Sequence, residues 1–403
     1  MLIEARIENF RSVRDEQALS MEAASLGEPG DQRLRQVGEK PRPFLPAAAI
    51  YGANASGKSN WLYALDFMRQ AVVDSHRHWS PSGGVVGRQP FAWGPKKQEP
   101  TLCEMSFLLD GVRHQYGFVA DGERFLEEWV YAWPRGRKQT WLEREGQEVA
   151  VGDKLQGENR LVEEVLRPNA LFLSTAAQLS HPQLTPIYRW FEQIRVFRKL
   201  QSLASGYVGD RSRYERLLQR REQIVDLLRY ADFDVVDIKF VEIDPSVPLR
   251  PGHRIFVRHR PSEHAWLPLD DESSGTQRLF DMALDILEAL ATGSLLIIDE
   301  LEASLHPLLA CQVIRLFNEP ASNPHNAQLL FATHDTRLLG THFGEPLLRR
   351  DQVWLTEKDD DGASVLYPLT DYKPRKSENL ERGYLQGRYG AIPLVGHLVR
   401  ADA

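Results

Sequence analysis

The sequence predicts an α/β fold with two additions, an antiparallel β-subdomain and a short helical arm. An apolar strand, AAAIY, runs into a Gly-rich turn and then into a helix beginning near Ser59. Between about Gln89 and Arg144, apolar and polar residues alternate between Asp-Gly and Pro-Arg-Gly turns, which is typical of an antiparallel meander. From about Asp234 onward, strand and helix patterns alternate again. Together these patterns indicate two α/β lobes.

The chain divides into three segments. Residues 1–180 form the expected N-terminal lobe, which begins with the strand LIEARIENF and contains the meander. Residues 181–233 show helical periodicity in IYRWFEQIRVFRKL and YERLLQRREQIVDLLRYA, which predicts the arm. Residues 234–403 form the expected C-terminal lobe, with strands at VVDIKFVEI, SLLIIDE and QLLFATHD.

Composition and charge exclude several classes of protein. The 403 residues are 42% hydrophobic and 26% charged, enough for a large core, and the net charge of -7 argues against a uniformly basic nucleic-acid coat. Cys103 and Cys311 have no partner at metal-ligand spacing, so neither a disulfide framework nor a structural zinc site is expected. The charged N-terminus lacks the apolar block of a secretion signal, and no run of about 18 apolar residues occurs. We therefore expect a cytoplasmic protein without a membrane segment.

The Gly-rich turn GANASGKS, residues 52–59, has the spacing G-x-x-x-x-G-K-[ST] between a strand and a helix. Gly52 and Gly57 allow the backbone N–H groups to turn inward around phosphate oxygens. Lys58 is expected to reach the outer phosphates, and the Ser59 hydroxyl to bind Mg²⁺. The alternative is a chance Gly-rich turn, but the strand before it and the helix after it both match the context that the motif requires.

Two later strands end in polar groups at what should be the same sheet edge. SLLIIDE places Asp299 to hold Mg²⁺ or its waters and Glu300 to polarise an attacking water, although an acid pair after a strand also suits a solvated turn. QLLFATHD ends in Thr333, His334 and Asp335. His334 can contact a terminal phosphate or the attacking water, or it can be an ordinary surface histidine.

The stretch SSGTQ, residues 273–277, directly precedes the amphipathic run RLFDMALDILEAL and lies about twenty residues before Asp299. Its hydroxyl groups are typical of a helix cap. The same N–H groups and positive helix end can also hold a phosphate that belongs to another molecule. Both interpretations are compatible with the sequence.

These motifs together resemble an ABC-type P-loop ATPase head of the SMC, RecF and OLD group. In that resemblance GANASGKS corresponds to Walker A, SSGTQ to a variant ABC motif, LLIIDE to Walker B and His334 to the switch histidine. IENFRSV at 7–13 is similar to the N-terminal strand and Phe-basic-Ser turn of the group, and EASLHP at 302–307 to its D-loop. The resemblance covers both expected lobes.

The resemblance implies that the chain binds ATP and Mg²⁺ and hydrolyses ATP. It also implies a homodimer, possible higher oligomers, and an ABC motif that caps the nucleotide of a second head, with Thr276 replacing the second glycine of the motif. The implied catalytic residues are Glu300 and His334, and the implied metal ligands are Ser59, Gln178 and Asp299. The implied nucleotide contacts are Arg11, Gly52, Asn54, Ala55, Ser56, Gly57, Lys58, Ser59, Asn60, Ser274, Gly275 and Thr276.

The Q-loop glutamine of such heads joins the metal site. ALFLSTAAQ, residues 170–178, is a strand-like run that ends in Gln just before the expected arm, so Gln178 is our choice and Gln89 the weaker candidate. A surface glutamine is the alternative.

The C-terminal segment DYKPRKSENLERGYLQGRYGAIP, together with ESSGTQRLF and SLHP, is similar to RloA-type, abortive-infection-associated ABC ATPases. That similarity implies a role in phage defence or genome surveillance, often beside a companion nuclease of the RloB-like, Toprim type. Residues 335–403 are too short to contain such a nuclease, and the acidic run EKDDDGAS at 357–364 suits a hairpin turn better than a nuclease site.

Two basic clusters have alternative interpretations. RSRYERLLQRR at 211–221 and KPRK at 373–376 can contact DNA, RNA or an acidic partner. For the first cluster a solvated helix face is the simpler explanation, and for the second a protein contact is favoured.

The sequence therefore predicts an ATPase that dimerises around ATP and couples nucleotide state to a partner or nucleic acid. The first alternative is a regulatory subunit whose ATP binding holds or releases a companion nuclease with little turnover. The second is an autonomous nuclease, for which no convincing acid cluster remains.

Overall fold

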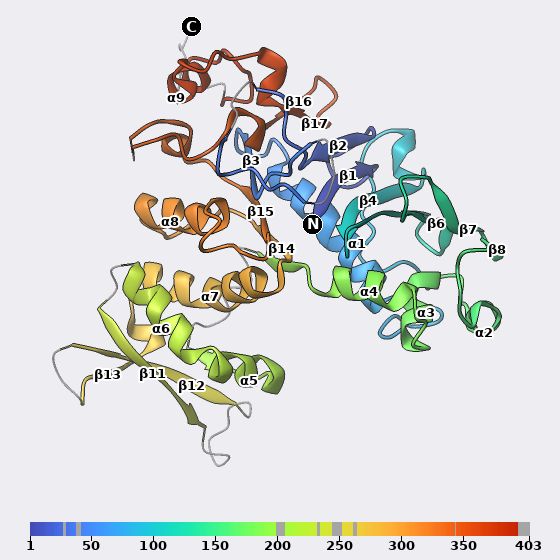
Figure 1. Cartoon of the computed structure of the whole chain (residues 1–403), viewed down its shortest axis with the longest axis horizontal. Coiled ribbons are helices and arrows are strands. Elements are labelled where there is room, and N and C mark those ends of the chain that lie inside the picture. The colour runs from blue at the N-terminus through green and yellow to red at the C-terminus, as the bar shows by residue number, and fades with distance from the viewer. Residues whose placement is uncertain are drawn as a thin grey trace, which may run out of the picture.

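A computed structural model of the chain describes residues 1–26, 30–37, 42–198, 206–231, 234–243, 252–260, 264–342 and 344–393 (Figure 1). At its centre lies a six-stranded sheet, and its strands are parallel except for the last hairpin strand. The strand order is β17 (Ser364–Pro368), β16 (Val353–Lys358), β3 (Ala47–Gly52), β15 (Gln328–Ala332), β14 (Leu295–Ile298) and β9 (Arg195–Phe197).

The inner strands of this sheet are apolar throughout because both of its faces are covered. Ala48 and Ile50 of β3 pack in the core that contains α1 (Lys58–Asp74). Ala49 and Tyr51 pack in the second core, with α7 (Ser274–Thr292) and α8 (Pro307–Asn318). Successive side chains of a strand point to opposite faces, so α1 lies on one side of the sheet and α7 and α8 on the other.

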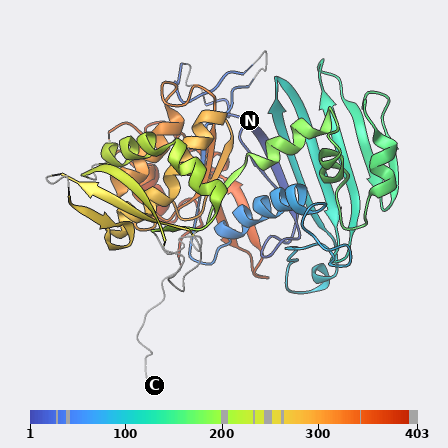
Figure 2. The same cartoon turned by 90° about the horizontal axis from the view of Figure 1, so that it is seen from below.

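A seven-stranded antiparallel sheet covers the far side of α1, so that α1 lies between two sheets (Figure 2). Its order is β2 (Gln17–Ser20), β1 (Leu2–Glu8), β4 (Thr101–Leu109), β5 (Val112–Ala120), β6 (Phe125–Trp133), β7 (Gln139–Glu145) and β8 (Glu148–Val151). The predicted meander is present, and the N-terminal strand pairs with it. This arrangement confirms the predicted α/β fold class with its antiparallel subdomain.

The helices α5 (Arg211–Gln219) and α6 (Arg221–Tyr230) lie on the α7 side of the molecule, next to a small sheet (Figure 1). That sheet contains β10 (Tyr207–Val208), β12 (His253–His259), β11 (Val235–Glu242) and β13 (Trp266–Pro268). The basic cluster at 211–221 is largely ion-paired. Arg211 pairs with Glu215 at 2.9 Å, Arg216 with Glu288 of α7 at 2.9 Å, and Arg221 with Asp237. These pairs favour a structural role for the cluster.

The remaining helices are α2 (Asn159–Val165), α3 (Phe172–Gln178), α4 (Leu184–Glu192) and α9 (Leu380–Leu385). Short 3₁₀ helices occur at Pro95–Lys97, Leu269–Asp271, Thr336–Leu339, Arg350–Gln352 and Leu369–Tyr372. Among the described residues, no helix has the length and apolar character needed to cross a bilayer. The acidic run at 357–364 forms the β16–β17 turn, as predicted.

Two local predictions were wrong. The run 170–178 is helix α3 rather than a strand, because five consecutive residues from Phe172 to Ala176 are buried and a run buried on all sides has no diagnostic period. The helical pattern of IYRWFEQIRVFRKL ends at Glu192, after which Arg195–Phe197 forms β9 and pairs with β14. A segment predicted as arm thus contributes the edge strand of the central sheet, and the boundaries at residues 180 and 233 remain a proposal.

Glu128 on β6 joins the antiparallel sheet to α3. Its carboxylate accepts hydrogen bonds from the backbone N–H groups of Phe172 at 2.6 Å and Leu173 at 3.0 Å and from the Tyr116 hydroxyl at 3.0 Å. Arg144 pairs with the same carboxylate at 3.4 Å, and both side chains are fully buried. The acid thus satisfies N–H groups at a helix start that has no side-chain cap of its own.

We expect Glu128→Ala to lower the free energy of unfolding by about 3–5 kcal/mol, because it leaves Arg144 as a buried charge without its partner. Glu127→Ala, one residue earlier on the exposed side of the strand, should change it by less than about 0.5 kcal/mol. Urea denaturation of both variants measures this. Equal stabilities of the two variants would contradict the role assigned to Glu128.

Candidate functional site

The Gly-rich turn connects β3 to α1, and two of its glycines are required by their surroundings. At Gly52 a Cβ atom would lie 2.4 Å from the carbonyl oxygen of Thr356. At Gly57 φ is +112°, and a Cβ atom would lie 2.0 Å from Ser364 Oγ. The turn is therefore fitted closely against β16 and β17, while Asn54 and Ala55 at its tip are exposed.

Lys58 is buried at the base of the turn. Its Nζ donates to the carbonyl oxygens of Gly52 at 2.8 Å and Ala53 at 3.0 Å. Burial lowers the pKa of Lys58 to about 8, against the opposing charges of Glu302, Asp299 and Glu300. A desolvated ammonium group surrounded by the peptide groups of the turn is well placed to bind an anion.

Ser59 and Asp299 meet at the C-terminal edge of the central sheet. The Ser59 hydroxyl donates to Asp299 Oδ1 at 2.8 Å, and the Tyr63 hydroxyl donates to Asp299 Oδ2 at 3.1 Å. Asp299 is 5% exposed. Hydroxyl and carboxylate oxygens are the donors that Mg²⁺ prefers, so this pair fits the ion that the motif implies. Tyr63 was missed from the sequence, although it lies one helical turn after Ser59 on the same face of α1.

Glu300 and His334 flank the same edge. Glu300 has φ +52°, an uncommon conformation for a side chain other than glycine, which turns the chain sharply after β14. The backbone N–H of His334 donates to Glu302 Oε1 at 2.5 Å. His334 is exposed. The partial desolvation of its imidazole and the charge of Lys58 nevertheless lower the pKa of His334. The carboxylates of Glu302 and, to a smaller extent, Glu300 oppose that effect. Both predicted catalytic residues therefore lie within electrostatic reach of Lys58.

Arg11 lies beside the start of α1, as the N-terminal turn predicts. Its NH1 group donates to Asn60 Oδ1 at 3.4 Å, and its guanidinium lies 4.5 Å from the centre of the Tyr63 ring. Its Nε donates to Gln89 Oε1 at 2.8 Å. Burial lowers the pKa of Arg11. Gln89, the weaker Q-loop candidate, is therefore next to the site.

Gln178 is not near the site. Its side chain forms a hydrogen bond with Tyr188, and the Tyr188 hydroxyl donates to the carbonyl oxygen of Val73 at 3.2 Å. Val73 lies about four helical turns along α1 from Ser59, or about 20 Å. The proposed metal role of Gln178 is therefore wrong, because α3 packs at the end of α1 opposite to the Gly-rich turn.

The stretch SSGTQ divides between two roles. Ser273 is the N-cap of α7, and its Oγ accepts from the N–H of Thr276 at 3.1 Å and contacts the Thr276 hydroxyl at 2.8 Å. Thr276 is 3% exposed, so its side chain packs inward and cannot contact a ligand in this conformation. Ser274 is exposed and Gly275 half-buried, which leaves these two at the helix tip.

Two of the acids before this helix, Asp270 and Glu272, are paired with basic side chains. Arg254 contacts Asp270 at 3.4 Å, and His259 contacts Glu272 at 2.7 Å, both from strand β12. The Gln277 amide donates to the carbonyls of Asp270 and Glu272 at 2.9 Å. Carboxylates that would repel a phosphate are thereby held by neighbouring groups.

Arg278 is a further residue that the sequence motifs did not indicate. Its NH2 group donates to the carbonyl oxygens of Asp299 and Glu300, both at 3.3 Å, and its guanidinium lies 4.4 Å from the centre of the Phe197 ring. It follows Ser274 by one helical turn. The exposed tip of α7 is therefore tied directly to the backbone of the two acids.

Comparison with known proteins identifies a family. Residues 47–340 match the family described as “AAA domain, putative AbiEii toxin, Type IV TA system”. A search of curated proteins gave no match. The matched range contains the Gly-rich turn, the helix tip at Ser274, the acids after β14 and His334.

Solved structures with similarity to this chain include three SMC heads. The first, the SmcHead bound to the C-winged helix domain of ScpA, has a TM-score of 0.44 and 15% identity and covers 92% of this chain and 99% of its own. The SMC head domain from Thermotoga maritima has a TM-score of 0.41 and 15% identity, with coverage of 91% and 98%. The Smc head with an extended coiled coil bound to the C-terminal domain of ScpA, from Pyrococcus furiosus, has a TM-score of 0.40 and 14% identity, with coverage of 92% and 97%.

Arg278→Met should lower the rate of the nucleotide hydrolysis that the sequence predicts at least about tenfold, while changing nucleotide affinity less than about threefold. The reason is that it releases the backbone of both acids but leaves the Gly-rich turn intact. Arg211→Met removes an exposed arginine of α5 and serves as the control. Phosphate release and nucleotide binding are measured on the same preparations. Unaltered hydrolysis in a folded Arg278→Met protein would show that the contact has no positioning role.

Proposed function

The chain belongs to the AAA-domain family that matches residues 47–340, and on that premise we propose that it is an ATPase whose two copies close around ATP. In this proposal each nucleotide is bound by the Gly-rich turn of one copy and the tip of α7 of the other. A C2 arrangement places the same surface on both copies, so two equivalent composite sites form.

The exposed hydroxyl of Ser274 is the observation that carries this proposal. Capping of α7 inside the chain is performed by Ser273, so Ser274 is not needed for that purpose. Its exposure, with Gly275 beside it, offers a hydroxyl and N–H groups at a positive helix end. A phosphate on a second copy is the ligand that such a tip suits.

Each residue of the site has a proposed task. Lys58 and the backbone of the turn hold the phosphates, and the Arg11–Asn60 pair contacts the nucleotide beside the start of α1. A bound Mg²⁺ would be held by Ser59 and Asp299 and would neutralise charge on the phosphates. Glu300 accepts a proton from the attacking water.

His334 follows β15, the strand next to the one that precedes these acids, and its lowered pKa favours the neutral imidazole. A neutral imidazole can accept a hydrogen bond from the attacking water or donate one to the terminal phosphate. The hydrogen bond from its N–H to Glu302 fixes the start of the segment that carries it.

The proposed biological role rests on the family match and on the resemblance of the C-terminal segment. The family description refers to a toxin of a Type IV toxin–antitoxin system, and the C-terminal segment resembles RloA-type proteins. We propose a role in defence against phage, with nucleotide state passed to a companion nuclease or to DNA or RNA. Glu288 on α7 forms ion pairs with Arg216 on α5 and with Arg195 on β9. These pairs support the arm as the route, since they tie it to the helix that carries Ser274.

The same ion pairs favour a second candidate function, a regulatory subunit with little turnover. If α7 moves when ATP binds, the arm follows without any need for hydrolysis. In that case ATP binding alone holds or releases the companion nuclease.

In a Glu300→Gln background, Ser274→Arg should preserve ATP binding but abolish dimerisation in ATP and Mg²⁺, because the added side chain blocks the phosphate and its charge occupies the tip. Ser212→Arg, an exposed serine at the start of α5, is the matched control and should still dimerise. Light scattering measures the mass. A dimer that survives Ser274→Arg would refute the composite site.

Glu300→Gln alone distinguishes the two functions in cells that carry the natural gene neighbourhood. If hydrolysis drives the output, protection against phage is lost, as it is with Lys58→Ala. If binding alone suffices, Glu300→Gln protects at least as well as the unaltered protein while Lys58→Ala does not. Plaque counts measure this, and Glu319→Gln, an exposed acid outside the site, is the control.

A further inference from the structure

A cavity of about 650 Å³ lies apart from the Gly-rich turn. Three segments distant in sequence line it, residues 30–33, residues 339–341 with 345–350, and residues 375–380. Arg349 and Arg350 in its wall precede β16, whereas the Gly-rich turn follows β3, the parallel neighbour of β16. The cavity is therefore at the edge of the central sheet opposite to the proposed ATP site.

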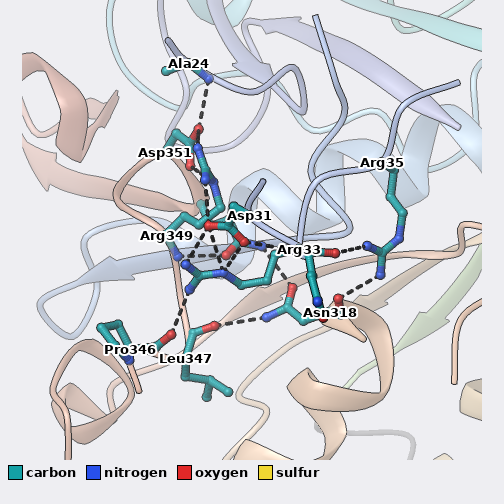
Figure 3. A network of polar contacts seen from close by, with 11 residues as sticks. Ala24, Asp31, Arg33, Arg35, Asn318, Pro346, Leu347, Arg349 and Asp351 are labelled. Carbon is teal, nitrogen blue, oxygen red and sulfur yellow. Dashed lines mark hydrogen bonds and ion pairs between the residues drawn. The ribbon is translucent and has the colours of Figure 1, made fainter. Parts of the chain in front are cut away.

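Asp31, Arg33 and Arg349, which we call the floor of the cavity, belong to a network of charged side chains (Figure 3). Arg349, whose side chain is 1% exposed, pairs with Asp31 at 2.7 Å and with Asp351 at 2.9 Å. Arg33 pairs with Asp31 at 2.7 Å and donates to the carbonyl of Pro346 at 2.7 Å. Although burial opposes it, hydrogen bonds from Arg33 and Arg349 keep the pKa of Asp31 below its usual value. Asp31 is thus ionised and already compensated by arginines.

Basic residues outnumber acidic residues in the lining of the cavity. Its charged lining residues are the basic Arg33, Arg349, Arg350, Arg375 and Lys376 and the acidic Asp31, Glu345 and Glu378. Of the acids, Glu378 pairs with Arg388 at 2.6 Å and accepts from the Tyr389 hydroxyl at 2.6 Å, a hydrogen bond that lowers its pKa. Arg375 and Lys376 are exposed at the mouth. An anion entering the cavity therefore meets more cationic side chains than carboxylates.

Part of the wall is apolar, with Leu339, Pro346, Leu348 and Leu380 among the lining residues. Inorganic phosphate alone would leave this wall in contact with water. A ligand that joins a phosphate to an organic group would place its charge at the rim and its apolar part against these side chains. A volume of this size suits a ligand as large as a nucleotide.

We propose that this cavity is a second ligand site, which binds a phosphorylated small molecule of nucleotide size. Arg350, Arg375 and Lys376 contact the phosphate groups, since guanidinium groups match phosphate oxygens in pairs and an ammonium adds a point charge. The buried network of Arg349, Asp31 and Arg33 holds the floor in place before the ligand arrives.

The test uses the full chain with Lys58→Ala, so that the Gly-rich turn does not compete, and uridine 5′-diphosphate as the probe, with uridine as the phosphate-free comparison. Calorimetry should give saturable binding of the diphosphate, one per chain, and none of uridine. Adding Arg375→Gln and Lys376→Gln, both exposed at the mouth, should weaken binding at least about tenfold.

The control adds Lys373→Gln and Arg382→Gln instead, which removes the same charge from exposed residues outside the cavity and should change affinity less than about twofold. Thermal melting of both proteins checks that they are folded. The proposal is overturned if the diphosphate does not saturate, if uridine binds equally well, or if the two double variants lose the same affinity. It is also overturned if a 5′-phosphorylated oligonucleotide binds and the diphosphate cannot displace it.

Discussion

The contact between the Ser59 hydroxyl and the Asp299 carboxylate is the interaction on which the rest of the site depends. It joins the first residues of α1 to the end of β14, and it exists because β3, β15 and β14 run parallel and end at one edge. The same edge receives His334 after β15. Parallel topology thus gathers residues that lie far apart in the chain into one polar site between two apolar layers.

In the proposed dimer, the helix α7 extends that site beyond a single chain. One serine at its start satisfies the backbone of its own helix, and the next serine faces outward. Arg278, one turn further on, holds the carbonyls of the two acids. A phosphate that another copy binds at Ser274 would therefore contact the same helix whose Arg278 positions Asp299 and Glu300. In the other direction, Glu288 ties α7 to the arm.

The sequence was most informative where backbone geometry or a buried strand requires a particular residue type. The glycines of the turn are needed for φ and for close approach, and AAAIY, LLII and QLLFA had to be strands covered on both faces. It failed at 170–178, because a run buried on all sides has no period that separates helix from strand. Gln178 was misplaced for that reason.

Residues outside the motifs were harder to predict. Tyr63 and Arg278 each lie one helical turn after a motif residue, so spacing alone could have suggested that they share its face. That Thr276 faces inward depends on its hydroxyl bonding to Ser273, which a motif match does not reveal. The cavity at the opposite edge of the sheet is formed by three separate segments, and no local pattern brings them together.

The central claim is that two copies contribute to one site, and mixing two inactive proteins tests it most directly. Lys58→Ala chains retain an intact helix tip but no functional turn, and Ser274→Arg chains have the reverse. The account predicts that neither hydrolyses ATP alone, whereas an equimolar mixture at high concentration recovers up to about a quarter of the unaltered rate, since each mixed dimer has one complete site. A mixture as inactive as its two components would contradict the account.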